Sequence, residues 1–218
     1  MKKILLFNIF VIFFITLFCS LGTWQLYRLQ WKQDLISQID QGLKSTPIKY
    51  SNKIINDYQR VVLEGKYDFK NQIYLYSLNS KGQPGFDVIT PFQTIDNENI
   101  LINRGWINKE MKNNPEINLE KKNKIQGLLR KIVKKNIFKP ENDIKKNFWF
   151  YINLNEIKEI TGKNFSNYVI FLEDEIINLP IPKKITIAVP NNHLKYAITW
   201  YSISISILFY FLYFRRQL

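Results

Sequence analysis

The sequence predicts a membrane protein in which two transmembrane α-helices, one at each end, bracket a mostly antiparallel β domain. Apolar runs at Ile4–Leu21 and Leu194–Phe214 predict the helices, because a helix of about 20 apolar residues crosses roughly 30 Å of hydrocarbon. Short strand-like segments between these runs predict the β domain. The length from Gly22 to His193 is sufficient to bury a core.

The strand predictions depend on short runs rich in β-branched and aromatic residues. Turn signals such as Lys81–Gly85 and Asp96–Asn99 separate them. The runs are Arg60–Asp68, Gln72–Ser77, Phe86–Phe92, Asn99–Trp106, Lys124–Val133, Phe148–Asn153 and Tyr168–Asp174. Their number and spacing favour a small antiparallel barrel or sandwich of the α+β type.

One segment of the middle region has helix signals. Asn153–Gly162 begins with a capping residue, Asn153 or Asn155, and ends at Gly162. The polar and charged segment Lys109–Asn123 predicts a loop.

The composition limits the classes of partner. The formal charge is +13, from 31 Lys and Arg against 18 Asp and Glu. A basic domain anchored to a bilayer would face anionic head groups or an acidic partner. The basic residues are dispersed and no segment resembles a recognition helix, so we expect no nucleic-acid binding. The heavy use of Lys, Asn and Ile is typical of AT-biased coding, which weakens the charge as a functional signal.

Neither the cysteine count nor the motifs favour a thiol site or an enzyme. The single cysteine, Cys19, excludes an intrachain disulfide, a thiolate zinc site and a paired-cysteine copper site. Gly82 and Gly85 lack the helix and the Lys-Ser/Thr pair of a phosphate loop, and no nucleophile motif accompanies His193. Glu173–Glu175 is typical of a solvated turn. We therefore expect a protein that is not an enzyme.

The N-terminal segment allows three interpretations. Ile4–Phe18 fits a signal peptide, with a small-x-small cleavage sequence at residues 20–22. A lipoprotein would use Cys19, but Phe18 is too bulky for the preceding position. Apolar character continues through Leu26, which favours an uncleaved anchor.

We expect a cytoplasmic tip at 1–3, a membrane helix at 4–26, an extracytoplasmic mostly-β domain at 27–190, a membrane helix at 191–214 and a cytoplasmic tail at 215–218. Basic residues at the outer tips favour two cytoplasmic termini: Lys2, Lys3, Arg215 and Arg216. Other cations flank the opposite side, so the charge signal is weak. No Arg- and Ser-rich transit segment precedes the first helix, which favours a bacterial inner membrane with a periplasmic domain.

Aromatic and cationic residues follow the first apolar run. In a continued helix over Gly22–Ile36, one face carries Trp24, Arg28, Trp31 and Leu35. Indoles often lie at a bilayer boundary, so this face fits an interfacial anchor. That interpretation leaves unexplained a guanidinium held between two indoles.

The second helix repeats this pattern at its start. His193, the only histidine, shares a helical face with Ala197, Trp200 and Ser204, and Tyr196 flanks them. This face would fit a flat macrocycle whose metal is reached by a neutral imidazole. The alternative, a histidine that contacts lipid head groups, stays open.

Three cations lie at the same depth as His193. They are Arg28, Lys32 and Lys195. Each would bind the propionates of a macrocycle through charge-assisted hydrogen bonds.

Seven segments, taken in order, carry a resemblance to a known family. They are GTWQLYRLQWK (Gly22–Lys32), GFDVITPF (Gly85–Phe92), ILINRGW (Ile100–Trp106), GLLR (Gly127–Arg130), FKPEND with the FWFY cluster (Phe138–Tyr151), ITG (Ile160–Gly162) and NNHLKYAITWY (Asn191–Tyr201). In this order the chain resembles a bacterial-type member of the Surfeit locus protein 1 family, the assembly factors of cytochrome c oxidase. The match runs nearly end to end.

The resemblance implies a role in building the haem a centres of oxidase subunit I. The protein would bind or hand over haem a, or stabilise an assembly intermediate. Its partners would be subunit I, other assembly factors and the lipid bilayer. A histidine near the second helix is the proposed haem ligand in haem-binding bacterial members, and it matches His193. The expected pocket around this axial ligand consists of Trp24, Arg28, Trp31, Tyr196 and Trp200.

The chain departs from the family pattern in its aromatic cluster. Members often carry a histidine beside the tryptophan and an aspartate soon after, where this chain has Phe148, Phe150 and Asn153. We therefore expect Trp149 and Tyr151 to be core residues without a polar role.

Two rival functions remain. A haem-independent scaffold would hold oxidase subunits or other factors through the β domain around Asn103–Trp106, a segment that also fits a strand ending in a glycine turn with a core Trp. An exported enzyme would lose its first helix and begin at Thr23.

Overall fold

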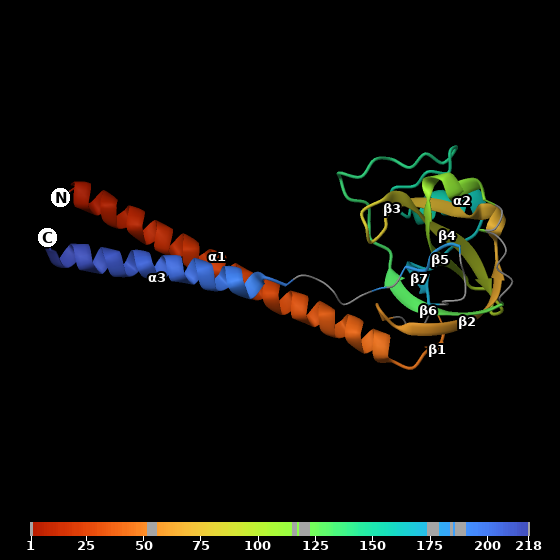
Figure 1. Cartoon of the computed structure of the whole chain (residues 1–218), viewed down its shortest axis with the longest axis horizontal. Helices are drawn as coiled ribbons and strands as arrows, with labels where there is room; N and C mark the ends of the chain where they lie inside the picture. The colour runs from red at the N-terminus through yellow and green to blue at the C-terminus, as the bar shows by residue number, and fades with distance from the viewer. Residues whose placement is uncertain are drawn as a thin grey trace. The chain divides into compact units, whose positions relative to one another are not determined.

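The structure is a computed structural model that describes residues 2–51, 56–114, 117, 123–173, 179–183, 185 and 191–217. The chain divides into two compact units, residues 1–39 with 186–218, and residues 40–185. The first contains most of α1 (Lys2–Lys44) and all of α3 (His193–Gln217), which run side by side in Figure 1. The second contains the β-strands.

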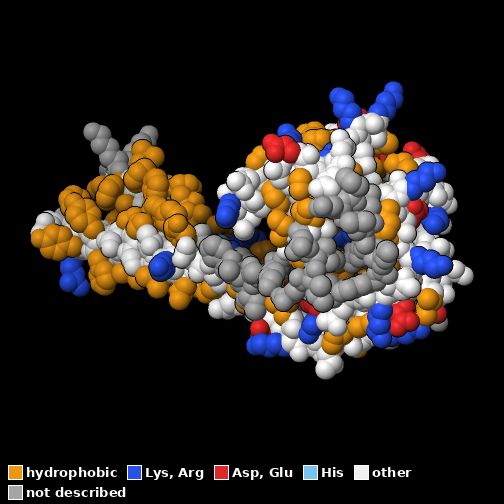
Figure 2. Space-filling model, turned by 45° about the vertical axis from the view of Figure 1, so that its right-hand side comes forward, with side chains coloured by type: hydrophobic (Ala, Val, Ile, Leu, Met, Phe, Trp, Pro, Cys, Tyr) orange, Lys and Arg blue, Asp and Glu red, His pale blue; other side chains and the backbone are white. Residues whose placement is uncertain are grey.

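Both predicted terminal helices are confirmed. α1 is continuous over 43 residues, so it is about 65 Å long and includes the predicted continuation through Gly22–Ile36. Within the described part of the chain, two helices, α1 from Ile4 onward and α3, are long and apolar enough to cross a membrane. Their side chains are mostly exposed, and Figure 2 shows hydrophobic side chains gathered over the helices, whereas most of the charged side chains in view lie over the strand unit. Exposed apolar surface of this extent needs a partner or a lipid environment.

Seven strands form one mixed sheet in the order β1-β2-β6-β7-β5-β4-β3, with an additional pairing of β2 and β4. Their bounds are Ile48–Lys49 (β1), Arg60–Tyr67 (β2), Ile73–Leu78 (β3), Pro84–Thr94 (β4), Asn99–Asn108 (β5), Lys124–Lys131 (β6) and Tyr168–Leu172 (β7). Among these described strands, five pairings are antiparallel, and β1–β2 and β5–β7 are parallel. A mostly antiparallel sheet is therefore present, while its classification as a small barrel or sandwich stays a prediction.

The core lies on both faces of the central strands. One cluster includes Ile100 and Ile102 of β5, and a second includes their neighbour Leu101, because successive side chains of a strand point to opposite faces. The second cluster also contains Ile157 of α2 (Leu154–Thr161). Coverage from both sides explains why nearly all of β4 and β5 is buried rather than alternating.

The predicted short helix is confirmed with its end signals. The Asn153 side chain caps α2 by accepting a hydrogen bond from the Asn155 backbone N–H at 3.1 Å. Gly162 ends the helix in the left-handed region, with φ of 70°. Two short 3₁₀ helices, η1 (Phe69–Asn71) and η2 (Lys109–Asn113), complete the described elements. The remainder of the predicted loop Lys109–Asn123 lies largely outside the described residues.

The strand predicted at Phe148–Asn153 is wrong. Only isolated bridges occur there, between Trp149 and Leu75 and between Phe148 and Asp143. The run is held by a few backbone hydrogen bonds and by side chains: the Trp149 N–H donates to the Tyr74 carbonyl at 3.0 Å, and Asn142 accepts a hydrogen bond from the Phe150 backbone N–H at 2.8 Å. Trp149 and Tyr151 are buried, as expected of core residues.

The Asn103–Trp106 segment is an interior segment rather than a docking surface. All four residues are buried, so these side chains do not themselves offer a docking surface, while binding of oxidase subunits by the surrounding β domain stays a prediction. Gly105 has φ of 131°, and a Cβ on it would lie 2.3 Å from the Ile181 carbonyl oxygen. The glycine therefore allows close approach of Ile181, whose backbone exchanges hydrogen bonds of 2.7 and 2.9 Å with Trp106. The predicted glycine turn is absent, because β5 continues to Asn108, but the core Trp is confirmed.

A buried cation lies beside this segment. Arg104 is 1% exposed, and its Nη1 donates to Gln72 Oε1 at 3.1 Å. The same oxygen accepts a hydrogen bond from Thr90 Oγ1 at 2.8 Å. The guanidinium also lies 5.4 Å from the Tyr67 ring centroid and 5.0 Å from that of Phe69. The hydrogen bond from Nη1 and the two ring contacts offset part of the cost of removing this charge from water.

Candidate functional site at the paired helix ends

Small residues allow α1 and α3 to approach closely. A Cβ on Gly22 would lie 2.9 Å from Tyr201 Cζ, so only glycine fits against that ring as it stands. Cys19 Sγ and Ser204 Oγ lie 3.1 Å apart, and Thr23 Oγ1 and Tyr201 Oη lie 2.9 Å apart. Close packing of small and polar residues is typical of helix pairs in membranes.

His193 lies at the first residue of α3 and contacts α1 directly. Its Nδ1 is 2.7 Å from Oε1 of Gln25, one turn beyond Gly22. A carbonyl oxygen only accepts hydrogen bonds, so this contact requires the tautomer that is protonated at Nδ1, in which Nε2 keeps its lone pair. Histidines that bind metals are commonly oriented in this way, through the nitrogen that does not bind the metal.

The face of α1 that carries Trp24, Arg28 and Trp31 is partly as expected. The Arg28 guanidinium lies 4.6 Å from the Trp31 ring centroid. Among the described residues no corresponding ring contact joins Arg28 to Trp24, so the expected pair of flanking indoles is reduced to one. Trp24 and Trp31 are each 53% exposed, and Tyr196 at the start of α3 is exposed as well. These rings are therefore free to contact lipid or a ligand.

The predicted face of α3 is covered by α1. Ala197 and Ser204 are buried, and the Trp200 ring stacks on Phe18 with centroids 5.7 Å apart. A macrocycle lying against Ala197 and Trp200 would therefore have to displace α1. A ligand of His193 has to approach the imidazole from outside the contact between α1 and α3, where side chains are exposed.

The donor set limits the kind of metal that this site could hold. Within the described residues, no group of three or more His, Cys, Asp or Glu side chains could hold a metal ion. A bare transition metal usually takes three or four protein ligands. A lone histidine instead suits the axial position of a metal that is already bound in a macrocycle. Exposed cations, Arg28 within α1 and Lys195 in the first turn of α3, are present for acidic groups of such a ligand.

Gln25 is a site residue that the sequence pattern did not predict. It lies within the Gly22–Lys32 segment, three residues after Gly22, on the side of α1 that faces α3. A polar amide at this position of an apolar helix is itself a signal, since it needs a hydrogen-bond partner.

Comparisons with known proteins identify the family. The sequence model of the SURF1 family matches residues 12–205. A SURF1-like protein of Rickettsia conorii is 32% identical over 221 residues, covering 96% of this chain and 91% of the relative. Surfeit locus protein 1 of Gallus gallus is 31% identical over 217 residues (87% and 68%), and that of Homo sapiens is 27% identical over 209 residues (85% and 69%). The chain therefore belongs to the SURF1 family.

Proposed function

We propose that the protein is a membrane-anchored assembly factor for cytochrome c oxidase that binds haem a through His193 and hands it over during maturation of subunit I. Family membership supports the role in oxidase assembly that the resemblance implies. The observation that carries the haem proposal is the hydrogen bond from His193 Nδ1 to Gln25, which leaves Nε2 available for an iron. The proposal includes no catalytic step.

The proposed setting is a bacterial inner membrane. The length and apolar character of α1 and α3 support two spans. The basic ends of the chain, including Arg215 and Arg216 in the last turn of α3, support cytoplasmic termini and a periplasmic β domain.

Each residue of the site has a distinct proposed role. His193 binds the haem iron as axial ligand, and Gln25 fixes the imidazole tautomer and orientation. Arg28 and Lys195, with Lys32, bind the propionates by charge-assisted hydrogen bonds. Trp24, Trp31 and Tyr196 exclude water around the ring. Trp200 holds α3 against Phe18 and thereby supports the position of His193.

The test is the absorption spectrum of the full chain purified from cells that make haem a. We expect a haem spectrum that is lost or strongly altered in His193→Ala and retained in Asn192→Ala, a change of the neighbouring exposed residue. An unchanged spectrum in His193→Ala would refute the ligand.

The same purification distinguishes the rival scaffold function from the proposed haem binding. A haem-independent scaffold would co-purify oxidase subunits while remaining colourless, and His193→Ala would not affect that co-purification. Mass spectrometry of the purified chain also decides whether α1 is retained, since an exported enzyme would begin at Thr23.

A further inference from the structure

A loop after β6 presents large apolar side chains to solvent. Ile137 and Phe138 are 88% and 85% exposed, and Val133 is exposed nearby. Ile137 and Phe138 occupy the two central positions of a turn, closed by a 3.0 Å hydrogen bond from the Lys139 backbone N–H to the Asn136 carbonyl. Turn centres usually carry Gly, Pro, Asn, Asp or Ser. The apolar pair is therefore unusual for a turn in contact with water.

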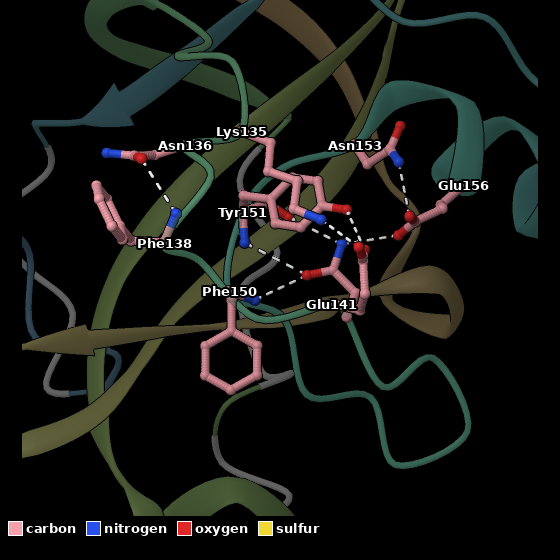
Figure 3. Close-up of polar contacts among 9 residues, drawn as sticks. Lys135, Asn136, Phe138, Glu141, Phe150, Tyr151, Asn153 and Glu156 are labelled. Atoms are coloured by element: carbon pink, nitrogen blue, oxygen red, sulfur yellow. Dashed lines mark hydrogen bonds and ion pairs between the residues drawn. The ribbon is translucent and has the colours of Figure 1, made fainter.

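The turn is ordered by its own side chains. Asn136 Oδ1 accepts a hydrogen bond from the Phe138 backbone N–H at 3.2 Å. Asn142 ties the returning chain to the strand unit, because its Nδ2 donates to Glu156 Oε2 at 2.7 Å. In Figure 3 the Phe138 ring points away from this polar cluster and makes none of the marked contacts.

A second cluster closes the base of the loop. Lys135 forms an ion pair with Glu141, and Tyr151 Oη donates to Glu141 Oε2 at 2.9 Å. The Lys135 ammonium also lies 5.2 Å from the Tyr151 ring centroid. These contacts join the start of the loop at Lys135 to its end at Glu141 and to Tyr151.

The segment that forms the turn is basic. From Lys131 to Pro140 the chain contains lysines and no acidic residue. Lys131 and Lys134 are exposed, and the Lys134 side chain makes no hydrogen bond or ion pair with the part of the chain that the structure describes. Lys139 is partly engaged, since its Nζ donates to the Phe150 carbonyl at 3.1 Å.

We propose that residues 131–139, here called the docking turn, bind the surface of an anionic bilayer, with Ile137 and Phe138 inserted at the boundary between head groups and acyl chains. Lys131 and Lys134 then lie among the lipid phosphates. Exposed apolar side chains beside lysines are the combination that interfacial membrane segments use. The inference rests on the proposed membrane anchorage: a tethered domain meets the bilayer at high effective concentration, so one small contact suffices.

The test uses the full chain in vesicles of phosphatidylglycerol and phosphatidylcholine. Cys19→Ser removes the native thiol and retains a hydroxyl near Ser204. Phe138→Cys then accepts an environment-sensitive fluorophore in the docking turn. The control is Ile95→Cys, labelled in the turn between β4 and β5, where Ile95 is 63% exposed.

We expect a blue-shifted emission at position 138, and quenching by spin-labelled lipid several-fold stronger than at position 95. The difference in quenching between positions 138 and 95 should be smaller in vesicles of pure phosphatidylcholine and in the double variant Lys131→Gln/Lys134→Gln. Equal quenching at both positions in anionic vesicles overturns the inference. A blue shift without lipid quenching also overturns it, and indicates that the turn contacts a protein surface instead.

Flotation of the same vesicles separates this inference from the proposed anchorage. Protein that floats with the vesicles but keeps a water-exposed label refutes the docking turn alone. Protein that does not float refutes the anchorage and the docking turn together.

Discussion

Two of the arginines that lie against aromatic rings in the described part of this protein have opposite surroundings. Arg28 lies beside Trp31 on an exposed stretch of α1, whereas Arg104 lies beside Tyr67 and Phe69 in the interior of the strand unit. Arg104 also donates to Gln72, which in turn binds Thr90.

The difference in burial separates a structural role from a binding role. A buried guanidinium costs free energy unless its donors are satisfied, so the surrounding polar residues are part of the fold. An exposed guanidinium beside an indole contributes little to stability. Arg28 is therefore available for a ligand, whereas Arg104 belongs to the interior.

The largest effect should follow from removing the buried arginine. We expect Arg104→Ala to lower the free energy of unfolding by about 3–5 kcal/mol, because it breaks a buried network and leaves a cavity. Arg28→Ala should change it by less than about 0.5 kcal/mol. Urea unfolding of the full chain in detergent, followed by near-ultraviolet circular dichroism, measures both. Equal losses would contradict the division of roles.

The next effect concerns the orientation of His193. Gln25→Leu removes the acceptor for Nδ1, and we expect the affinity for haem to fall about 10–100-fold. Gln25→Glu keeps an acceptor and should retain most of the affinity. Haem titration followed by absorbance measures this, with Gln30→Leu on an exposed face of α1 as control. If Gln25→Leu titrates like the control, Gln25 has no positioning role.

A smaller effect is expected from the exposed arginine itself. Arg28→Gln removes one charge-assisted hydrogen bond to a propionate, which corresponds to about a 10-fold weaker affinity for haem. Arg28→Lys should lose less. The loss should shrink for a haem whose propionates are esterified, and an equal loss with the ester would show that Arg28 acts in another way.

The smallest effect involves another cation beside a ring, Lys135 at Tyr151. Hydrogen bonds from Lys135 and then from Tyr151 lower the pKa of Glu141 from its ordinary value of 4.5. Because the pKa of this carboxyl is lowered, its ionised form stabilises the loop at pH values above the ordinary pKa. This contribution is lost as the pH falls through the lowered pKa. Fluorescence anisotropy of a label at Phe138→Cys should therefore fall below about pH 4.5.

Glu141→Gln provides the control for that titration. It should give a low anisotropy across the whole pH range. A label at Ile95→Cys should not respond to either change. A fall of equal size at Ile95 would mean that the whole strand unit, rather than the loop, responds to acid.

Local patterns predicted most of the strands but not their pairing. The β-branched runs that became β2, β4 and β5 carry their signal in short segments. The parallel pairing of β5 with β7 joins residues far apart in the chain, and no local pattern encodes it. Phe148–Asn153 has the composition of a strand, yet it forms only isolated bridges, and the Asn142 side chain accepts a hydrogen bond from its backbone. Such a tertiary hydrogen bond has no sequence signature.

The site was predictable only in part for a similar reason. Helical spacing placed Arg28 beside Trp31, and the position of His193 at a helix start followed from the end of the apolar run. The covered face at Ala197 depends on how α3 meets α1, which spacing within one helix does not determine. The exposure of Ile137 and Phe138 was likewise not predictable from the sequence, because apolar residues usually indicate core positions.

The contact between Gly22 and Tyr201 has an evolutionary consequence. Any side chain at position 22 would push the Tyr201 ring away, and that ring also bonds Thr23. The two positions should therefore change together across the lineage: a relative with alanine at the first should carry a smaller residue than tyrosine at the second. Substitutions that arise singly should be rare and followed by a compensating change, so this pair is inherited as one unit.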